Sequence, residues 1–243
     1  MCIDSCHISV NRTIPVDKQN ELESNKFVEL AKQSLLRDDY QCRFCGFKAK
    51  GAGQQVITIN GLYREDDFRL DNLTTVCPYC FLGQRLGHSA ITDEITFIYA
   101  PEITQAQLNQ LMRLLYFYQA FEIEEQDEYQ HKIPDEVQSI IDLKDQSNAI
   151  LTELRERVKL VSKQFDYCSL THLKTLTAFL FDLPNEKYEL RNKFFQNIRY
   201  LIKPETLASY NELYAKTVFK KMNGHKEIIE SLKVTVVDRS IFD

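Results

Sequence analysis

The apolar residues of this chain follow two different rhythms, and each rhythm predicts a different element. Between Asn25 and Leu36 they recur every three or four residues behind Ser24, which predicts a helix with Ser24 as its N-cap. The runs Gln54–Asn60 and Glu94–Tyr99 are short and rich in β-branched residues, so they predict strands. Asn60 is followed by glycine, a pair that is typical of a tight turn after the first strand.

Helical patterns dominate the rest of the chain. Thr104 and Gln107 fit a capping box that opens a helix reaching about Phe121. Pro134 begins a long apolar pattern that continues to about Gln164. Further helices are predicted at about 169–182, 186–202 and 205–222, and the tail 232–242 has the pattern of an edge strand or a disordered end.

An acidic stretch without periodicity separates the two halves of the chain. Residues 122–131 carry a run of carboxylates and no regular apolar spacing, which indicates a linker. We therefore expect an α+β fold in three parts. These are an N-terminal domain at residues 1–121, an acidic linker at 122–133 and a mainly helical region at 134–243.

Four cysteines stand in two pairs with the spacing Cys-x-x-Cys: Cys42, Cys45, Cys77 and Cys80. Thiolates at this spacing reach one tetrahedral Zn²⁺ from a tight turn, so we expect one structural zinc ion bound by all four. Gly46 follows the first pair, where the backbone must turn sharply, and Pro78 suits the start of a short helix reaching about Leu86. A knuckle, a hairpin and a helix that carries the last two ligands form a treble-clef zinc finger.

Charge and cysteine content limit the classes of function. The net charge of −5 gives no general attraction to nucleic acid or acidic membranes, and residues 37–86 carry seven bases against six acids. Seven cysteines, four of them in metal-binding pairs, favour a reducing compartment. The first residues lack a signal-peptide pattern, and no apolar run reaches the roughly 20 residues that span a bilayer. We therefore expect a cytoplasmic protein.

The sequence around the cysteines resembles the HNH endonuclease family. The strip 37–46 is similar to the family's first knuckle, and Asn72 precedes the second pair as it does there. The resemblance implies a strand His that activates water, and a closing Asn or His that holds a catalytic metal together with a strand Asp. Residues 54–60 contain neither Asp nor His, and Phe81 occupies the closing position. We therefore expect a frame without nuclease activity, in which Asn72 ties down the loop.

Further motifs resemble the IcmJ family, also called DotN, of the Dot/Icm type IVB secretion system. They cover about residues 30–120: Cys-x-Phe-Cys-Gly-Phe at 42–47, Asn60-Gly61-x-Tyr63, Arg69-Leu70-x-Asn72-Leu73 and Ile98-Tyr99-x-Pro101-Glu102-Ile103-x-Gln105-x-x-Leu108-Asn109. The resemblance carries over only the four cysteines as site residues, in the role of zinc ligands.

The IcmJ resemblance implies a non-catalytic adaptor. Members of that family bind the C-terminal extension of the coupling ATPase within the coupling complex, which recruits effector proteins for export. The resemblance implies attachment to the inner membrane only through this partner and other complex subunits, with no nucleic acid bound. Two alternatives stay open: a nucleic-acid-binding protein or HNH-type nuclease, and a secreted effector that shares the finger.

Overall fold

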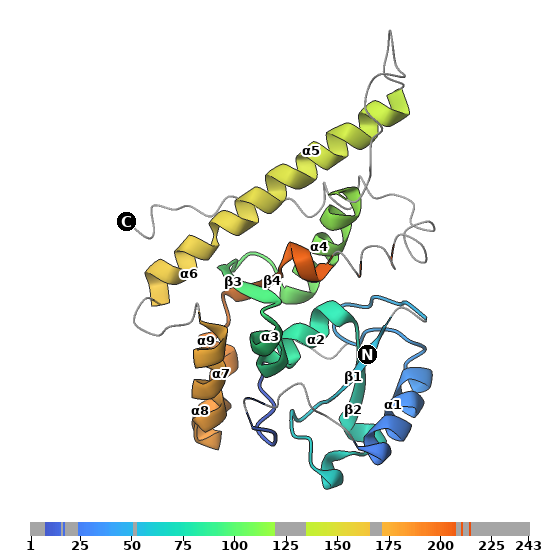
Figure 1. Cartoon of the computed structure of the whole chain (residues 1–243), viewed down its shortest axis with the longest axis vertical. Helices are drawn as coiled ribbons and strands as arrows, with labels where there is room; N and C mark the ends of the chain where they lie inside the picture. Colours follow the sequence, from blue (N-terminus) through green and yellow to red (C-terminus); the bar gives the residue numbers. More distant parts are fainter. Residues whose placement is uncertain are drawn as a thin grey trace.

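The computed structural model confirms a mixed α+β architecture with two small sheets (Figure 1). It describes residues 8–15, 17, 24–50, 53–119, 135–165, 172–207, 210 and 214. The helices are α1 (Asn25–Arg37), α2 (Pro78–Gln84), α3 (Leu86–Thr92), α4 (Gln105–Gln119), α5 (Asp135–Glu156), α6 (Val158–Phe165), α7 (Leu173–Asp182), α8 (Asn185–Tyr188) and α9 (Arg191–Phe194), with short 3₁₀ turns η2 (Glu65–Asp67) and η3 (Leu70–Asn72). The strands are β1 (Gln55–Thr58), β2 (Leu73–Val76), β3 (Ile95–Tyr99) and β4 (Ile198–Ile202).

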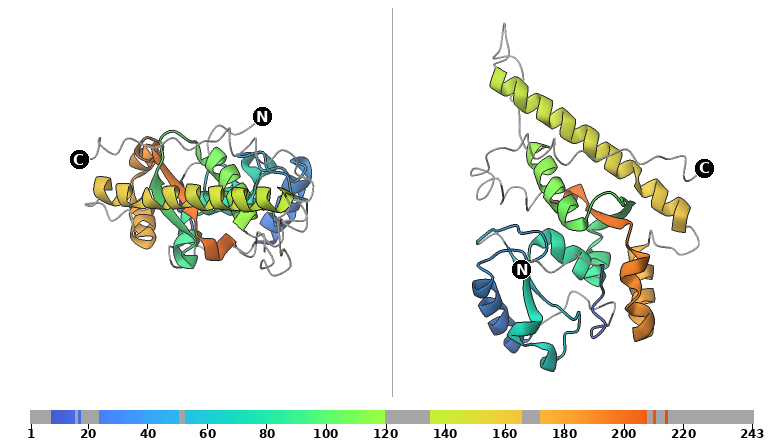
Figure 2. Two further views of the ribbon diagram at one scale, coloured as in Figure 1. Left: turned by 90° about the horizontal axis from the view of Figure 1, so that it is seen from above. Right: turned by 180° about the vertical axis from the view of Figure 1, so that it is seen from behind.

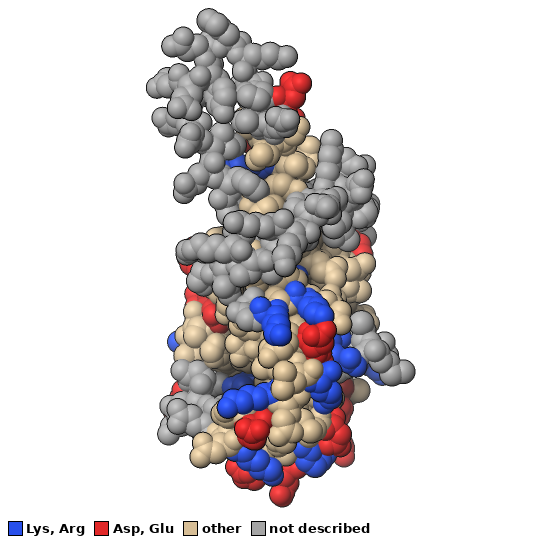
Figure 3. Space-filling view, turned by 90° about the vertical axis from the view of Figure 1, so that its right-hand side faces the viewer, with Lys and Arg blue, Asp and Glu red and all other residues tan. Residues whose placement is uncertain are grey.

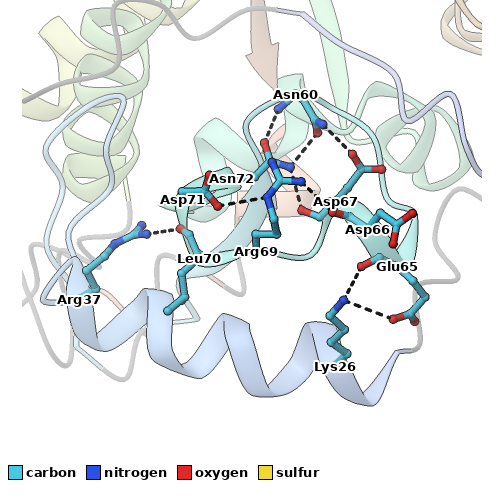
Figure 4. Close-up of polar contacts among 10 residues, drawn as sticks. All are labelled: Lys26, Arg37, Asn60, Glu65, Asp66, Asp67, Arg69, Leu70, Asp71 and Asn72. Atoms are coloured by element: carbon cyan, nitrogen blue, oxygen red, sulfur yellow. Dashed lines mark hydrogen bonds and ion pairs between the residues drawn. The ribbon is translucent and has the colours of Figure 1, made fainter.

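The first sheet is an antiparallel hairpin of β1 and β2, with α1 packed on it (Figure 1). The connection between the strands is held by Asn72, whose side-chain oxygen accepts a hydrogen bond from the backbone N–H of Asn60 at 3.2 Å (Figure 4). The Asn72 amide group in turn donates to the carbonyl of Asp67 at 2.9 Å. These bonds satisfy backbone groups that the turn leaves without ladder partners. Asn72 therefore has the structural role expected for it.

An ion pair at the end of α1 fixes this helix on the hairpin. Arg37 and Asp38 approach to 2.9 Å, and the Asp38 carboxylate also accepts the Thr75 backbone N–H of β2 at 3.0 Å. The Asp38 side chain is only 4% exposed. Burial alone would raise the pKa of Asp38, but the hydrogen bonds from Arg37 and Thr75 outweigh burial and hold that pKa below its usual value.

The second sheet joins segments that are far apart in the sequence. β4 pairs antiparallel with β3, from Ile95 opposite Ile202 to Tyr99 opposite Ile198. The predicted helix at 186–202 is therefore wrong in its last part, and its earlier part is two single-turn helices, α8 and α9. Residues 198–202 form a strand rather than a helix because β3 provides a partner for ladder hydrogen bonds. Local periodicity in the sequence cannot reveal such a distant partner.

The tight packing of this sheet on α2 involves Gly83. A Cβ at this position would lie 2.2 Å from the ring of Tyr200 in β4, so the glycine lets the helix approach the strand. The Tyr200 hydroxyl donates to the carbonyl of Tyr79 in the same helix at 2.9 Å. Helix α2 and strand β4 therefore contact each other directly.

The long helix predicted from 134 to 164 is interrupted at Arg157. α5 ends at Glu156 and α6 begins at Val158. The Arg157 side chain is 1% exposed and pairs with Glu102, and its carbonyl accepts the Tyr99 N–H at 3.5 Å. A buried guanidinium needs such partners, so these contacts fix the break between α5 and α6 next to the β3–α4 connection. α5 itself runs across the end of the molecule and packs along α4 (Figure 2).

One hydrophobic core runs from Ile8 to Tyr214 through both halves of the chain. It includes the four paired cysteines, β3, β4 and parts of α4 and α7. The predicted linker at 122–133 and the tail 232–242 lie outside the described residues, and the division of the chain into domains stays a prediction. The shared core nevertheless shows that the described parts of the two halves pack together.

We predict that Asp38→Asn lowers the free energy of unfolding by about 1–3 kcal/mol at neutral pH, because Asp38 then loses its charge-assisted bonds. The pKa of Asp38 is lower in the folded chain, so its contribution is present above the unfolded pKa of about 3.9 and is lost as the pH falls through the folded pKa. Urea titrations should show a constant difference from wild type between about pH 7 and pH 5, and a smaller one below about pH 4.

Asp39→Asn is the matched control, because this neighbouring side chain is 73% exposed and pairs only at the surface with Lys48. Equal losses of stability in the two variants would contradict the role given to Asp38.

Candidate metal centre

The first two cysteines project from a tight knuckle after α1. The Gly46 N–H donates to the carbonyl of Cys42 at 2.9 Å, and the Cys42 N–H donates to the carbonyl of Phe47 at 2.8 Å. Gly46 has φ +75°, a conformation that side chains other than glycine rarely adopt. The turn therefore brings the sulfurs of Cys42 and Cys45 to the same side.

The second two cysteines lie at the start of α2. Cys77 is the N-cap of this helix, and its sulfur accepts the backbone N–H of Cys80 at 3.5 Å. Pro78 occupies the first turn, where its missing N–H costs no hydrogen bond. The free N–H groups of a helix N-terminus favour negative charge, so this position stabilises thiolates.

The structure brings all four predicted cysteines together. Their sulfur atoms all lie within 4.8 Å of one another, and those of Cys45 and Cys77 are 3.6 Å apart. Sulfurs that share one tetrahedral zinc ion at about 2.3 Å lie roughly 3.8 Å apart, so the cluster has dimensions that fit a single ion. All four residues are buried and none forms a disulfide. Such a closed arrangement is typical of a structural metal site.

Ionisation of all four cysteines in this cluster requires a bound cation. Hydrogen bonds from the other thiols, first from Cys42, lower the pKa of Cys45. Burial, followed by the hydrogen bonds of Cys42 and Cys45, raises the pKa of Cys77 well above its usual value. Four thiolates at these distances repel one another in a low dielectric, so a bound cation is needed before all of them ionise.

Two side chains of α4 donate hydrogen bonds to the sulfurs of the second cysteine pair. The Asn109 amide donates to the sulfur of Cys80 at 3.2 Å, and the Arg113 guanidinium donates to the sulfur of Cys77 at 3.3 Å. The two residues are one helical turn apart, so they point from the same face of α4. Donors of this kind orient metal ligands and reduce their charge, and they influence metal affinity strongly.

Arg113 is held in an aromatic enclosure. Its guanidinium carbon lies 3.7 Å from the ring centroid of Phe47 and 4.7 Å from that of Tyr79, and the residue is only 4% exposed. Burial would lower the pKa of Arg113, but the negative charges of Cys77 and Cys45 outweigh burial and raise it. The residue therefore keeps its positive charge beside the cluster.

A chain of hydrogen bonds continues from the cluster to β4. Gln105 donates to the Asn109 side-chain oxygen at 2.8 Å and to the Tyr200 carbonyl at 3.0 Å. The Tyr200 N–H donates back to Gln105 at 2.9 Å. The sequence alone did not predict these roles, although the spacing of four residues between Gln105, Asn109 and Arg113 places the three polar side chains on one face of the helix.

The positions that carry catalytic side chains in HNH nucleases hold other residue types here. β1 contains no acidic or imidazole side chain, and Phe81 follows the last cysteine. Among the described residues, the histidine nearest in sequence to the second cysteine pair is His88. Its ring packs edge-on to that of Phe81, with the centroids 5.4 Å apart, and its Nε2 lies 3.6 Å from the carboxylate of Glu94. Burial lowers the pKa of His88, although Glu94 opposes the shift. The His88 side chain therefore contacts Phe81 and Glu94 rather than the cysteine pairs.

Comparison with known proteins shows that part of this chain is similar to a secretion protein. No protein-family model matches the chain. Over 94 residues the chain is 36% identical to the type 4 apparatus protein DotN of Legionella pneumophila. Part of this chain is homologous to DotN. The aligned stretch is 37% of this chain and 42% of DotN, so the chain spans less than half of that relative's length. The similarity to DotN confirms the resemblance inferred from the motifs. No described helix is both long and apolar enough to cross a membrane.

We predict that Arg113→Met weakens Zn²⁺ binding by about 10–100-fold, because the cluster loses a hydrogen bond and a compensating charge. Competition with a chromophoric chelator measures this affinity, and circular dichroism checks that the fold is retained. Arg113→Lys keeps the charge but not the planar group between the rings, so it should lose less affinity than Arg113→Met. Wild-type affinity in Arg113→Met would contradict the assigned role.

Proposed function

We propose that this chain is a non-catalytic, zinc-binding adaptor of a type IVB secretion coupling complex. The similarity to DotN is the observation that carries this proposal. The described site supports it, because a closed and buried cluster of cysteines suits a structural metal rather than a reactive one. In this function the chain binds the C-terminal extension of the coupling ATPase and supports effector recruitment.

The metal in this proposal is one zinc ion in an HNH-like treble clef. The knuckle at Cys42, the β1–β2 hairpin and the α2 N-terminus stand in the order of that motif. Bound zinc supplies folding free energy, on the order of 10 kcal/mol in small metal-dependent modules. Four cysteines hold it, while Asn109 and Arg113 orient the ligands of the second pair.

We propose further that the chain has no nuclease activity, and the side chains around the hairpin support this. A nuclease of this frame needs a base that activates water and open coordination positions on a metal. Neither β1 nor the end of α2 provides an imidazole or a carboxylate among the described residues. A zinc ion bound by all four cysteines would have no coordination position left for water.

The alternative is a nucleic-acid-binding protein or an HNH-type nuclease. Phosphate binding usually needs a continuous basic surface. On the face drawn in Figure 3, Lys and Arg are interspersed with Asp and Glu. The net charge of −5 also disfavours this alternative.

The proposed location follows from the proposed partner. We place the adaptor in the cytoplasm, attached peripherally to the inner membrane through the coupling ATPase and other subunits of the complex.

We predict that Cys77→Ser gives a zinc-poor, protease-sensitive protein that no longer captures the C-terminal segment of the coupling ATPase from the same secretion system. The reason is that the metal site shares one core with α4 and β4. Metal analysis, limited proteolysis and a pull-down with the purified segment measure the three effects. Cys168→Ser changes a cysteine outside the two pairs and is the matched control.

Capture of the segment by zinc-poor Cys77→Ser at wild-type strength would contradict the proposal. A magnesium-dependent cleavage of DNA by the wild-type protein, or binding to duplex that weakens steeply with salt, would instead support the alternative.

A further inference from the structure

A third aromatic ring reaches the enclosure of Arg113 from the C-terminal part of the chain. Tyr214 is fully buried, and its ring centroid lies 5.8 Å from the guanidinium carbon of Arg113. A ring face attracts a cation within roughly 6 Å of its centroid. The enclosure therefore has three aromatic walls, Phe47, Tyr79 and Tyr214, which come from separate parts of the chain.

Tyr214 contacts both of the other rings. Its ring packs edge-on to that of Phe47 with the centroids 5.0 Å apart, and it is tilted against that of Tyr79 with the centroids 6.2 Å apart. Phe47 closely follows the first cysteine pair, whereas Tyr79 lies between Cys77 and Cys80. Each cysteine pair thus has one ring close to it in the chain, and Tyr214 bridges these two rings.

Arg113 depends on the rings because hydrogen bonds do not fix its whole side chain. One terminal nitrogen donates to the sulfur of Cys77 at 3.3 Å, but the buried Nε has no hydrogen-bond partner among the described residues. A buried charged group with incomplete hydrogen bonding is costly unless its surroundings stabilise the charge. Ring faces supply this stabilisation and also confine the planar group. The rings therefore influence where the guanidinium lies relative to the sulfur.

Tyr214 is itself anchored in the core by its own part of the chain. The ring of Tyr210 stacks on that of Tyr214 with the centroids 6.4 Å apart, and it packs edge-on to that of Tyr79 at 6.5 Å. Leu207, which is also fully buried, belongs to the same core. The third wall of the enclosure is therefore held from the C-terminal side, independently of the two cysteine pairs.

We propose that Tyr214 is a positioning residue of the metal centre: its ring keeps Phe47 and Tyr79 together around Arg113 and so holds the guanidinium against the sulfur of Cys77. Tyr214 acts through Arg113 in this role and is not a ligand. Zinc retention then depends on a residue far along the chain from both cysteine pairs, and loss of the Tyr214 ring releases zinc faster. This inference rests on the zinc site of the proposed function and not on its secretion partner.

A positioning role and a purely structural role have different signatures. A residue that only fills the core contributes through its buried volume, and its effect is independent of Arg113. A ring that positions Arg113 has its effect only while the guanidinium is present. The two roles are therefore separated by a double-mutant cycle between Tyr214 and Arg113, and by comparison of an aromatic with an aliphatic replacement.

The test measures how fast the full, zinc-loaded chain releases zinc to an excess of a chromophoric chelator. Tyr214→Leu keeps an apolar side chain but removes the ring, so release should be roughly tenfold faster than from wild type. Tyr214→Phe keeps the ring and should release zinc at close to the wild-type rate. In a chain that already carries Arg113→Met, Tyr214→Leu should add little, because the group that the ring positions is gone.

Two further chains separate the effect on Arg113 from a loss of stability. A fluorinated phenylalanine at position 214 keeps the shape of the ring but weakens the negative charge of its face, so it should release zinc faster than Tyr214→Phe while the chain stays folded. Leu207→Ala is the matched control, because it removes buried apolar volume from the same part of the chain without removing a ring. Its effect on the release rate should multiply with that of Arg113→Met.

Three results would each overturn the inference. They are release from Tyr214→Leu at the wild-type rate, equal release rates from the fluorinated chain and Tyr214→Phe, and effects of Tyr214→Leu and Arg113→Met that multiply. Wild-type protein that binds no zinc would overturn the metal assignment together with this inference, so the two failures are distinguishable.

Discussion

The burial of four thiol groups at distances that fit one metal ion is the constraint on which the rest of this structure depends. A zinc ion bound by four thiolates retains two net negative charges, and burial makes uncompensated charge costly. The α2 N-terminus, the Asn109 amide and the Arg113 guanidinium all direct positive charge or N–H groups at the sulfurs. Arg113 in turn needs the rings that surround it. The site is therefore as much a property of α4 as of the two cysteine pairs.

This arrangement connects the metal centre with a strand far away in the sequence. Asn109 is oriented by Gln105, and Gln105 holds the backbone of Tyr200 in β4 through two hydrogen bonds. β4 completes the sheet with β3, and Gly83 allows its tyrosine to pack on α2. Metal binding is thus expected to stabilise the described C-terminal part as well as the finger. A rigid frame of this kind suits a protein that presents fixed surfaces to partners.

Local patterns in the sequence predicted the elements that depend on local chemistry. The helix predicted at 25–36 is α1 at Asn25–Arg37, because an N-cap and regular apolar spacing act within a single helix. The cysteine pairs come together because their spacing and Gly46 define the knuckle. β4 was predicted as helix, since its partner strand lies about a hundred residues earlier. Arg113 was not assigned to the site, because only the fold brings a helix side chain from beyond β3 to the sulfur of Cys77.

The metal content of the intact protein tests the central claim most directly. Protein purified without oxygen should contain one zinc ion per chain, and a strong chelator should release it together with four newly reactive thiols. The loss of zinc should also broaden the unfolding transition of the parts that share the core with β4. Metal-free protein that remains folded, or a cluster whose four thiols react freely before chelation, would contradict the account.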